Sequence, residues 1–280
     1  TNEGEPHKRQ RRMMQPAFHM KRIHGYGETM IQYAQRHADI WESDALDGQS
    51  VDVAHEMMRL AMAIVAKTLF DFDIKSEADE IGNALSSIVG LFERTIHPAA
   101  VLLTLMPTRK NIRFLRSRAR IDKTIYRMIA ERRASGKDHG DLLSMLLNAR
   151  DETDGTGMSD KQIHDEAITL FLAGHETTAN ALTWTWYALS QNPEVEARFH
   201  EELGEVLGGE LPTPDDLSKL EYTRRVFAES MRMYPPAYFI GRMAIEEFEL
   251  GGYTLPARSV LLLSPYVCQH NPSLFPDPER

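Results

Sequence analysis

The stretch LFLAGHETTANALTWTW, residues 170–186, constrains the fold more than any other part of the chain. Apolar residues occupy every face of this segment, and an all-round apolar helix crosses the interior of a large protein. Residues 174–178 nevertheless place a glycine, a histidine, a carboxylate and two hydroxyls at its middle. A helical glycine costs about 1 kcal/mol relative to alanine, and a buried polar group without a partner costs about 1–3 kcal/mol more. Such local exceptions indicate a functional site; the alternative is a packing glycine beside hydroxyls bonded to the preceding turn.

Helical periodicity dominates the chain. Apolar residues recur at three- and four-residue spacing over 7–37, 51–70, 77–92 and 111–135, and LLSMLLNAR predicts a further short helix. A long helix is expected from about 160 to 190, a helix of 221–234 ends at a double proline, and the period changes to two only over 240–265. The sequence therefore predicts a mainly α fold with a small antiparallel β region.

Caps sharpen two of these boundaries. Ser159 followed by Gln162 is a capping box for the long helix. Asn192 before Pro193 predicts an N-cap for the helix that follows.

Composition excludes several classes of protein. A net charge of −9 argues against a nucleic-acid partner. The sequence contains no run of 18 apolar residues, so it predicts no transmembrane helix in this chain. The single cysteine, Cys268, excludes an internal disulfide framework and fits a cytoplasmic setting. Both ends lie within polar sequence that is unlike natural termini, so we expect residues 1–280 to be a single partial domain.

The residues AGHETT then resemble a known motif. Ala173, Gly174, Glu176 and Thr177 match the oxygen-binding helix of the cytochrome P-450 family, the haem-thiolate monooxygenases, and His175 fills its variable position. The resemblance implies that the small residues make room for dioxygen on the distal face of the haem. It also implies that the acid and the alcohol, Glu176 and Thr177, deliver protons during catalysis.

Two further segments carry the resemblance. Glu229 and Arg232 in ESMRMYPP share one helical face and match the family's Glu-x-x-Arg pair, whose implied role is structural; the alternative is an exposed ion pair. HKRQRRMMQPAF resembles the family's Trp-x-x-x-Arg helix, with Arg11 as a haem-propionate ligand. His7 stands where tryptophan is usual, and its imidazole can also donate to a propionate. The other cations of this segment, Lys8, Arg9 and Arg12, are expected on a solvated helix face.

The sequence after the double proline continues this pattern. By resemblance, Arg242 also reaches a haem propionate, while Ala237 and Phe239, like Ala173, line the substrate pocket. Simple packing is the alternative for Ala237 and Phe239.

The family's haem-ligand loop, Phe-x-x-Gly-x-x-x-Cys-x-Gly, has no match in the chain. Cys268 lacks these surroundings, and we interpret it as a small buried residue at a strand end rather than the iron ligand. We therefore expect an incomplete P-450 fold that alone neither gives a thiolate-type carbon-monoxide spectrum nor turns over.

The compact loops and the single cysteine favour a soluble, bacterial-type, cytoplasmic protein, and the resemblance implies an oxidoreductase. It would use haem b (iron protoporphyrin IX) and O2 to insert one oxygen atom into a hydrophobic small molecule, with electrons from NAD(P)H through a ferredoxin- or flavin-type donor. The rival interpretation is a non-catalytic haemless remnant or helical binding scaffold. A zinc hydrolase on His175 is disfavoured because HETT lacks the second histidine.

Overall fold

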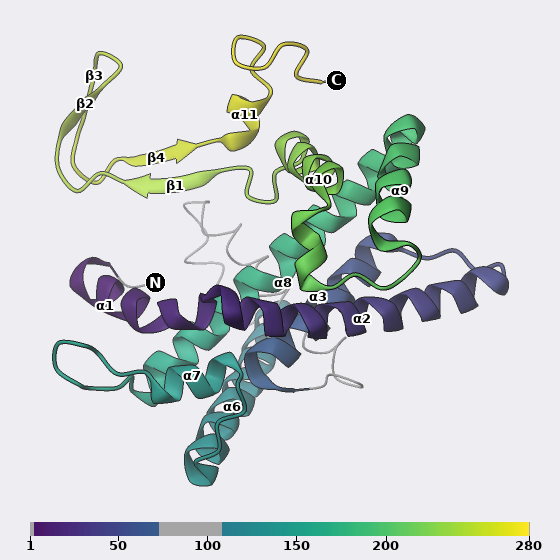
Figure 1. Cartoon of the computed structure of the whole chain (residues 1–280). Coiled ribbons are helices and arrows are strands. Elements are labelled where there is room, and N and C mark those ends of the chain that lie inside the picture. The colour runs from purple at the N-terminus through teal and green to yellow at the C-terminus, as the bar shows by residue number, and fades with distance from the viewer. Residues whose placement is uncertain (1–2, 73–107, 280) are drawn as a thin grey trace. The chain divides into compact units, whose positions relative to one another are not determined.

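The computed structural model describes residues 3–72 and 108–279, so the helix expected over 77–92 lies outside the described residues. The described residues up to Glu176 form one compact unit, and those from Thr177 onward form a second. The boundary falls inside one continuous helix, α8 (Figure 1).

Outside residues 73–107, the regular secondary structure of the first unit is entirely helical apart from one isolated β-bridge in a loop. Its elements are α1 (Gly4–Met14), the 3-10 helix η1 (Gln15–Phe18), α2 (Met20–Leu46), α3 (Val53–Phe70), α6 (Arg109–Ser135), α7 (Leu142–Asn148) and the first half of α8 (Asp160–Gln191). The helical pattern over 7–37 is therefore interrupted, because Pro16 has no N–H to continue the ladder of α1.

Side chains from six of these elements form the core of the first unit. Its most deeply buried members are Met62 and Ala66 of α3, Ile129 of α6, Leu143 and Leu146 of α7, and Ile163 and Ala167 of α8. This set explains why α7 is stable at only seven residues: Leu142, Leu143 and Leu146 are almost completely buried, and packing of an apolar face contributes most of the stability of a short helix.

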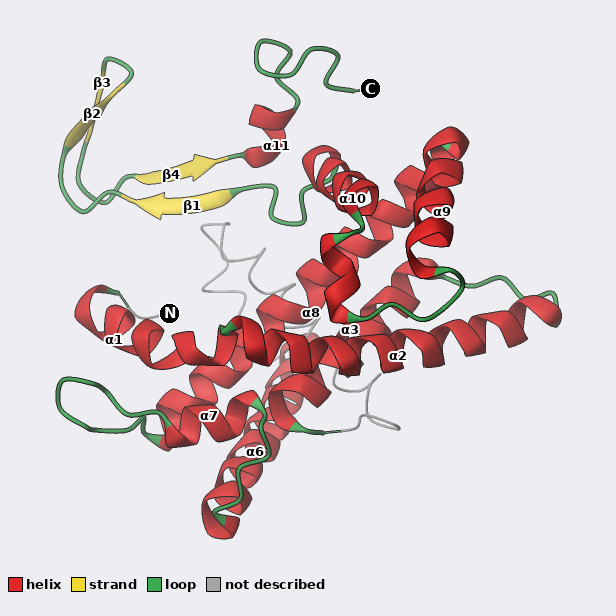
Figure 2. Ribbon diagram, viewed as in Figure 1, coloured by secondary structure: helices red, strands yellow, loops and turns green. Residues whose placement is uncertain are grey.

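The second unit joins helices to two small sheets (Figure 2). Its elements are the rest of α8, α9 (Pro193–Leu207), the 3-10 helix η3 (Pro214–Ser218), α10 (Glu221–Met233), β1 (Ile240–Met243), β2 (Phe248–Leu250), β3 (Tyr253–Leu255), β4 (Val260–Leu263) and α11 (Pro265–Gln269). Strand β1 pairs antiparallel with β4, Ile240 opposite Leu263, and β2 pairs antiparallel with β3. Gly251 and Gly252 both have positive φ, which the tight β2–β3 turn requires.

The two cap predictions have different outcomes. The backbone N–H of Ser159 donates to the Gln162 side chain at 2.9 Å, and that of Gln162 donates to Ser159 Oγ at 3.3 Å, so the capping box is confirmed. Asn192 is the N-cap residue of α9 with Pro193 at the first helical position, as predicted, but the expected side-chain cap does not form. Its side chain makes no cap to α9 and instead donates to the Ala188 carbonyl at 2.8 Å, because an amide NH2 can satisfy an orphan acceptor at the end of α8.

The predicted fold class is confirmed: the described residues are mainly helical with small antiparallel sheets. Among them, no helix is both long and apolar enough to cross a lipid bilayer. The expectation that α8 is buried on every side does not hold within the described residues, since Trp184, Trp186 and Tyr187 are exposed.

Candidate active site

The predicted motif of α8 divides between two faces of the helix. Ile163, Ala167, Phe171 and His175 recur every fourth residue and are buried, so they form the stripe that packs on the core. Ala173 and Thr177 lie one turn apart on a different face and are exposed, and Glu176 is half-buried. The structure thus places Ala173 and Thr177 of the motif together on an accessible helix surface. His175, at the variable position of the motif, is buried.

Gly174 belongs to the packed side. A Cβ added at this glycine would lie 3.3 Å from Cγ2 of Val65 on α3, which is closer than side chains ordinarily approach. The missing side chain therefore lets α3 and α8 pack closely. The geometry favours the packing alternative for Gly174, whose role as part of the oxygen groove stays a prediction.

His175 is the buried polar residue that the sequence left without a role. Only 1% of it is exposed, and neither ring nitrogen has a hydrogen-bond partner. Its ring lies 5.9 Å from that of Phe171, which in turn lies 6.0 Å from Phe70. Burial lowers the pKa of this imidazole, while the nearby carbonyls of Phe171 and Leu172 act in the opposite direction. The four-residue recurrence from Ile163 was the sequence signal that His175 faces the core.

The basic residues of α1 have different partners. Arg9 is not simply solvated as expected: its Nε donates to the buried Asp151 at 3.1 Å, and its Nη2 donates to the Thr156 hydroxyl. Arg12 lies 3.9 Å from the same carboxylate. The Arg11 side chain, by contrast, is exposed and makes no hydrogen bond or ion pair within residues 3–72 and 108–279. It is therefore available to an anionic group of a ligand.

His7 lies one helical turn before Arg11 and is exposed. Burial raises the pKa of Glu166 on α8, and the nearby His7 opposes that shift. The contact of His7 with a propionate stays a prediction.

Glu229 and Arg232 are brought together as their spacing on α10 predicts. Arg232 Nη2 lies 2.7 Å from Glu229 Oε1, and Nε donates to both carboxylate oxygens at 2.9 Å. Arg232 Nη1 donates to the carbonyls of Gln269 and Pro278, each at 3.0 Å. The Arg232 side chain is only 12% exposed, so this is not a plain surface ion pair. Arg232 ties α10 to α11 and to the segment that follows it.

The remaining predicted site residues lie around β1. Arg242 is exposed, and its Nη1 donates only to the Gly241 carbonyl at 2.8 Å. Ala237 is exposed in the loop before β1, whereas Phe239 is half-buried with its ring edge-on to that of Tyr238 at 4.7 Å. Arg242 thus has no carboxylate partner in the described part of the chain.

The interpretation of Cys268 as a buried residue at a strand end is wrong. Cys268 is exposed and lies on α11. The cause is local: Ser264 accepts from the Val267 backbone N–H, and Pro265 occupies the first helical position, so the chain after β4 turns into a helix. Cys268 lies on a short helix rather than in the family's ligand loop, so the prediction that it is not the iron ligand is retained.

The side chains at these positions offer two kinds of chemistry, anion binding and the anchoring of backbone, and they are divided between the two units. Arg11 and Arg242 offer charge-assisted hydrogen bonds to anions, the Ala173 and Thr177 face offers a small residue beside a hydroxyl, and Arg232 holds backbone. The sequence had not identified the buried Arg132–Asp141 pair between α6 and α7, whose atoms lie 2.8 Å apart. The only signal for it was Asp141 at the N-cap of α7.

Comparisons with known proteins give matches over the whole chain. The family model described as cytochrome P-450 matches residues 1–280. Cyclooctatin synthase of Streptomyces melanosporofaciens is 43% identical over the whole chain, and cyclooctat-9-en-7-ol 5-monooxygenase of the same organism is 42% identical. Pentalenene oxygenase of Streptomyces avermitilis is 36% identical over 98% of the chain. The chain spans 60% of the length of each of these relatives.

The structure search gives the same result. Two crystal structures of the cytochrome P-450DA haem domain, one of them a mutant, match with TM-scores of 0.85 and 0.89 at 27% and 28% identity. They cover 96% and 100% of the chain, which spans 59% and 62% of theirs.

Proposed function

The chain belongs to the cytochrome P-450 family, and from this premise we propose that the protein is a haem-dependent monooxygenase acting on a hydrophobic small molecule. The observation that carries the proposal is the division of the α8 motif between two faces. Ala173 and Thr177 lie on the accessible face, and the buried stripe that includes His175 holds the opposite side of the helix.

The residues present fit part of a haem site. Arg11 is an exposed cation without a partner in the described residues, and Arg242 is bonded only to a neighbouring carbonyl. A haem would supply iron that binds and activates O2, and its propionates would accept hydrogen bonds from these two guanidinium groups. His7, one turn from Arg11, would be an additional donor.

Thr177 and Glu176 would transfer protons to the reacting oxygen. A hydroxyl both donates and accepts, and a half-buried carboxylate can exchange its proton with solvent, so the adjacent pair can carry protons from solvent into a water-poor site. Ala173, one turn before Thr177, leaves room for a small gaseous ligand and for substrate beside the hydroxyl.

The substrate class is proposed from the relatives. The names of two of them specify oxidation of cyclooctat-9-en-7-ol and of pentalenene, and homologues of this chain oxidise terpenes. We infer a cyclic terpene or terpene alcohol as substrate, with Ala173, Ala237 and Phe239 at the pocket wall. The two electrons would come from NAD(P)H through a separate ferredoxin- or flavin-type protein.

The role of Thr177 is tested by Thr177→Ala in the full-length protein. Loss of the hydroxyl should uncouple electron consumption from product, so that NAD(P)H is oxidised while hydrogen peroxide accumulates. We expect product per NAD(P)H to fall by about tenfold or more, since a positioned proton-transfer group typically contributes about 10²–10⁴-fold to a rate. Thr178→Ala, which removes an exposed hydroxyl from the next position, is the matched control. Equal coupling in both variants and the wild type would remove Thr177 from the mechanism.

The second candidate is a haemless scaffold, favoured by the exposed position of the chain's single cysteine. A thiolate ligand requires a cysteine sulfur on iron, and Cys268 on α11 lacks the family's ligand-loop sequence. The carbon-monoxide difference spectrum separates the candidates. We expect the full-length protein to show the thiolate-type Soret band and the 280-residue chain to lack it. A full-length protein that binds no haem would support the scaffold instead.

A further inference from the structure

A polar pocket of about 520 Å³ lies in the first unit and contains none of the candidate site residues. One face of α2, the C-terminal end of α3 and the loop between α6 and α7 form its walls. Its charged and hydrogen-bonding side chains include Lys21, Arg22, Tyr26, Lys67, Asp71 and His139. Pockets of this size accept small organic ligands.

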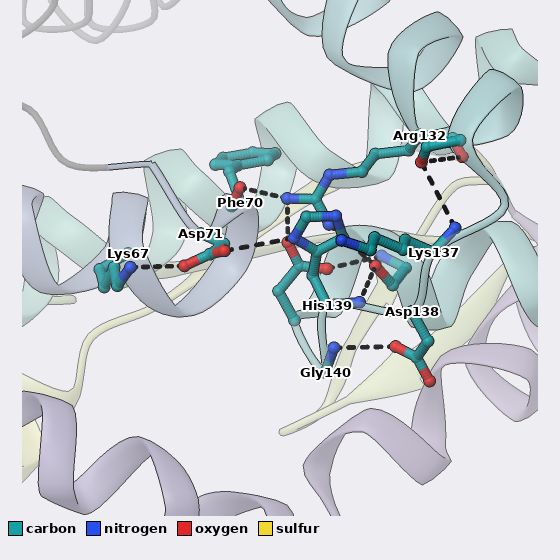
Figure 3. Close-up of polar contacts among 11 residues, drawn as sticks. Lys67, Phe70, Asp71, Arg132, Lys137, Asp138, His139 and Gly140 are labelled. Atoms are coloured by element: carbon teal, nitrogen blue, oxygen red, sulfur yellow. Dashed lines mark hydrogen bonds and ion pairs between the residues drawn. The ribbon is translucent and has the colours of Figure 1, made fainter.

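The carboxylates of the pocket are already compensated. Lys67 Nζ donates to Asp71 Oδ1 at 2.5 Å, and His139 Nδ1 lies 3.3 Å from Asp71 Oδ2. Figure 3 shows both side chains directed at this carboxylate. The hydrogen bond from Lys67 holds the pKa of Asp71 below its usual range. Asp141, at the pocket wall, is paired with Arg132 at 2.8 Å. Neither carboxylate therefore contributes an uncompensated negative charge.

The cations contributed by α2 are different. The side chains of Lys21 and Arg22 make no hydrogen bond or ion pair with any of the described residues. Arg22 Nη1 lies 3.6 Å from where a Cβ would stand on Gly140, so its guanidinium reaches across to the α6–α7 loop. Gly140 has a φ of +71°, a backbone conformation that strains any residue with a side chain. Because glycine has no side chain, the Arg22 guanidinium can lie close to the backbone of the loop.

The hydroxyl of Tyr26 completes the donor set. It is buried and has no hydrogen-bond partner. Burial raises the pKa of this phenol, so it is a neutral O–H donor at physiological pH. A buried donor left unsatisfied costs about 1–3 kcal/mol, which a bound acceptor would recover.

We propose that this pocket binds the phosphate group of a small molecule, either inorganic phosphate or a phosphate monoester. The excess positive charge of Lys21 and Arg22 selects an anion over a cation. The planar fork of Arg22 matches a pair of phosphate oxygens, and the Lys21 ammonium and the Tyr26 hydroxyl can each donate to a further oxygen. A phosphate presents more acceptor oxygens and more charge than a single carboxylate does.

Isothermal titration calorimetry in a phosphate-free buffer tests the site, with inorganic phosphate, glycerol 3-phosphate and succinate as probes. The first two distinguish the free ion from the ester, and succinate tests whether any dianion suffices. Tyr26→Phe removes only the hydroxyl, and Arg22→Gln removes an exposed charge, so neither should disturb folding. Lys123→Gln, an exposed cation of α6 outside the pocket, is the matched control.

We expect wild type and Lys123→Gln to bind at least one of the two phosphates with one site per chain, and to bind succinate more weakly. Tyr26→Phe and Arg22→Gln should each weaken phosphate binding by about tenfold or more, the loss expected for a hydrogen bond to a charged group. Phosphate should also raise the melting temperature of wild type more than that of either variant. Absence of phosphate binding to wild type, equal affinity for succinate, or equal affinities in all four proteins would overturn the proposal.

Discussion

His175 illustrates a polar side chain that is held inside an apolar stripe without a partner. A buried histidine in this setting is neutral, because charging it would place an unpaired cation in the core. The native protein therefore binds fewer protons at this site than the unfolded chain does, whose histidine has an ordinary pKa of about 6.5. Stability must then depend on pH through this residue.

The sign of that dependence follows from the lowered pKa of His175. Above about pH 6.5 the imidazole is neutral in both states and contributes nothing to pH dependence; below it the unfolded state gains a proton and the free energy of unfolding falls. We predict that His175→Leu flattens the pH dependence of stability between about pH 6.5 and 5. At pH 7 the variant should match wild type or be stabilised by about 1 kcal/mol, because the unsatisfied ring nitrogens are gone.

Urea unfolding followed by circular dichroism at several pH values measures this effect. His200→Leu, which replaces an exposed histidine of α9, should leave the pH dependence unchanged. A His175→Leu variant as acid-sensitive as wild type would show that His175 is not the responsible group.

At the scale of elements, the join between α6 and α7 depends on one buried ion pair. Arg132 is 11% exposed and Asp141 3% exposed, and Arg132 also donates to Ser144 Oγ at 3.0 Å and to the Phe70 carbonyl at 2.9 Å. We predict that Arg132→Met destabilises the protein by about 3–5 kcal/mol, because it leaves the Asp141 carboxylate buried without its partner.

The neighbouring residue supplies the control. Arg133 pairs with Asp160, but its side chain is 43% exposed, so Arg133→Met should cost less than about 1 kcal/mol. Adding Asp141→Asn to Arg132→Met removes the uncompensated charge and should restore part of the stability. Chemical denaturation of the four proteins gives the comparison; similar losses for the Arg132 and Arg133 variants would contradict the argument.

The ends of helices were predictable where residues close in sequence determine them. The start of α8 followed from Ser159 and Gln162, whose side chains make the expected reciprocal hydrogen bonds. The break after α1 was equally local, in Pro16, but helical periodicity continued through it and concealed it. Asn192 could not be resolved from sequence, because its amide can serve either the helix before it or the helix after it.

At the scale of the molecule, Arg232 joins parts of the second unit that are far apart in sequence. It bonds Glu229 on its own helix and the carbonyls of Gln269 and Pro278. We predict that Arg232→Lys increases amide hydrogen exchange in α11 and the following segment by about tenfold or more, since an ammonium cannot reproduce the fork and each lost hydrogen bond is worth roughly 1 kcal/mol.

Hydrogen exchange resolved by mass spectrometry measures this change peptide by peptide. Arg225→Lys is the control, because Arg225 pairs with Glu221 at 3.5 Å on an exposed face of the same helix. Faster exchange in both variants, or in neither, would mean that Arg232 does not hold this segment.

The site was predictable from sequence only in part. The motifs indicated which residues carry the chemistry, and the spacing of Glu229 and Arg232 gave their contact. The sequence did not show that Ala173 and Thr177 lie on a different face from Gly174, because apolar residues surround the motif on every side. The contact of Gly174 with Val65 depends on how α3 packs, and no local pattern encodes that.

The tryptophans are divided between the two units, so each unit has its own intrinsic fluorescence. Trp41 lies on α2 in the first unit, whereas Trp184 and Trp186 lie on α8 beyond the unit boundary. The indole of Trp184 is stacked on Tyr234 at 4.5 Å, so its emission is sensitive to the contact between α8 and the end of α10. Intrinsic fluorescence therefore reports mainly on the second unit, and replacing Trp41 by phenylalanine would make it report on that unit alone.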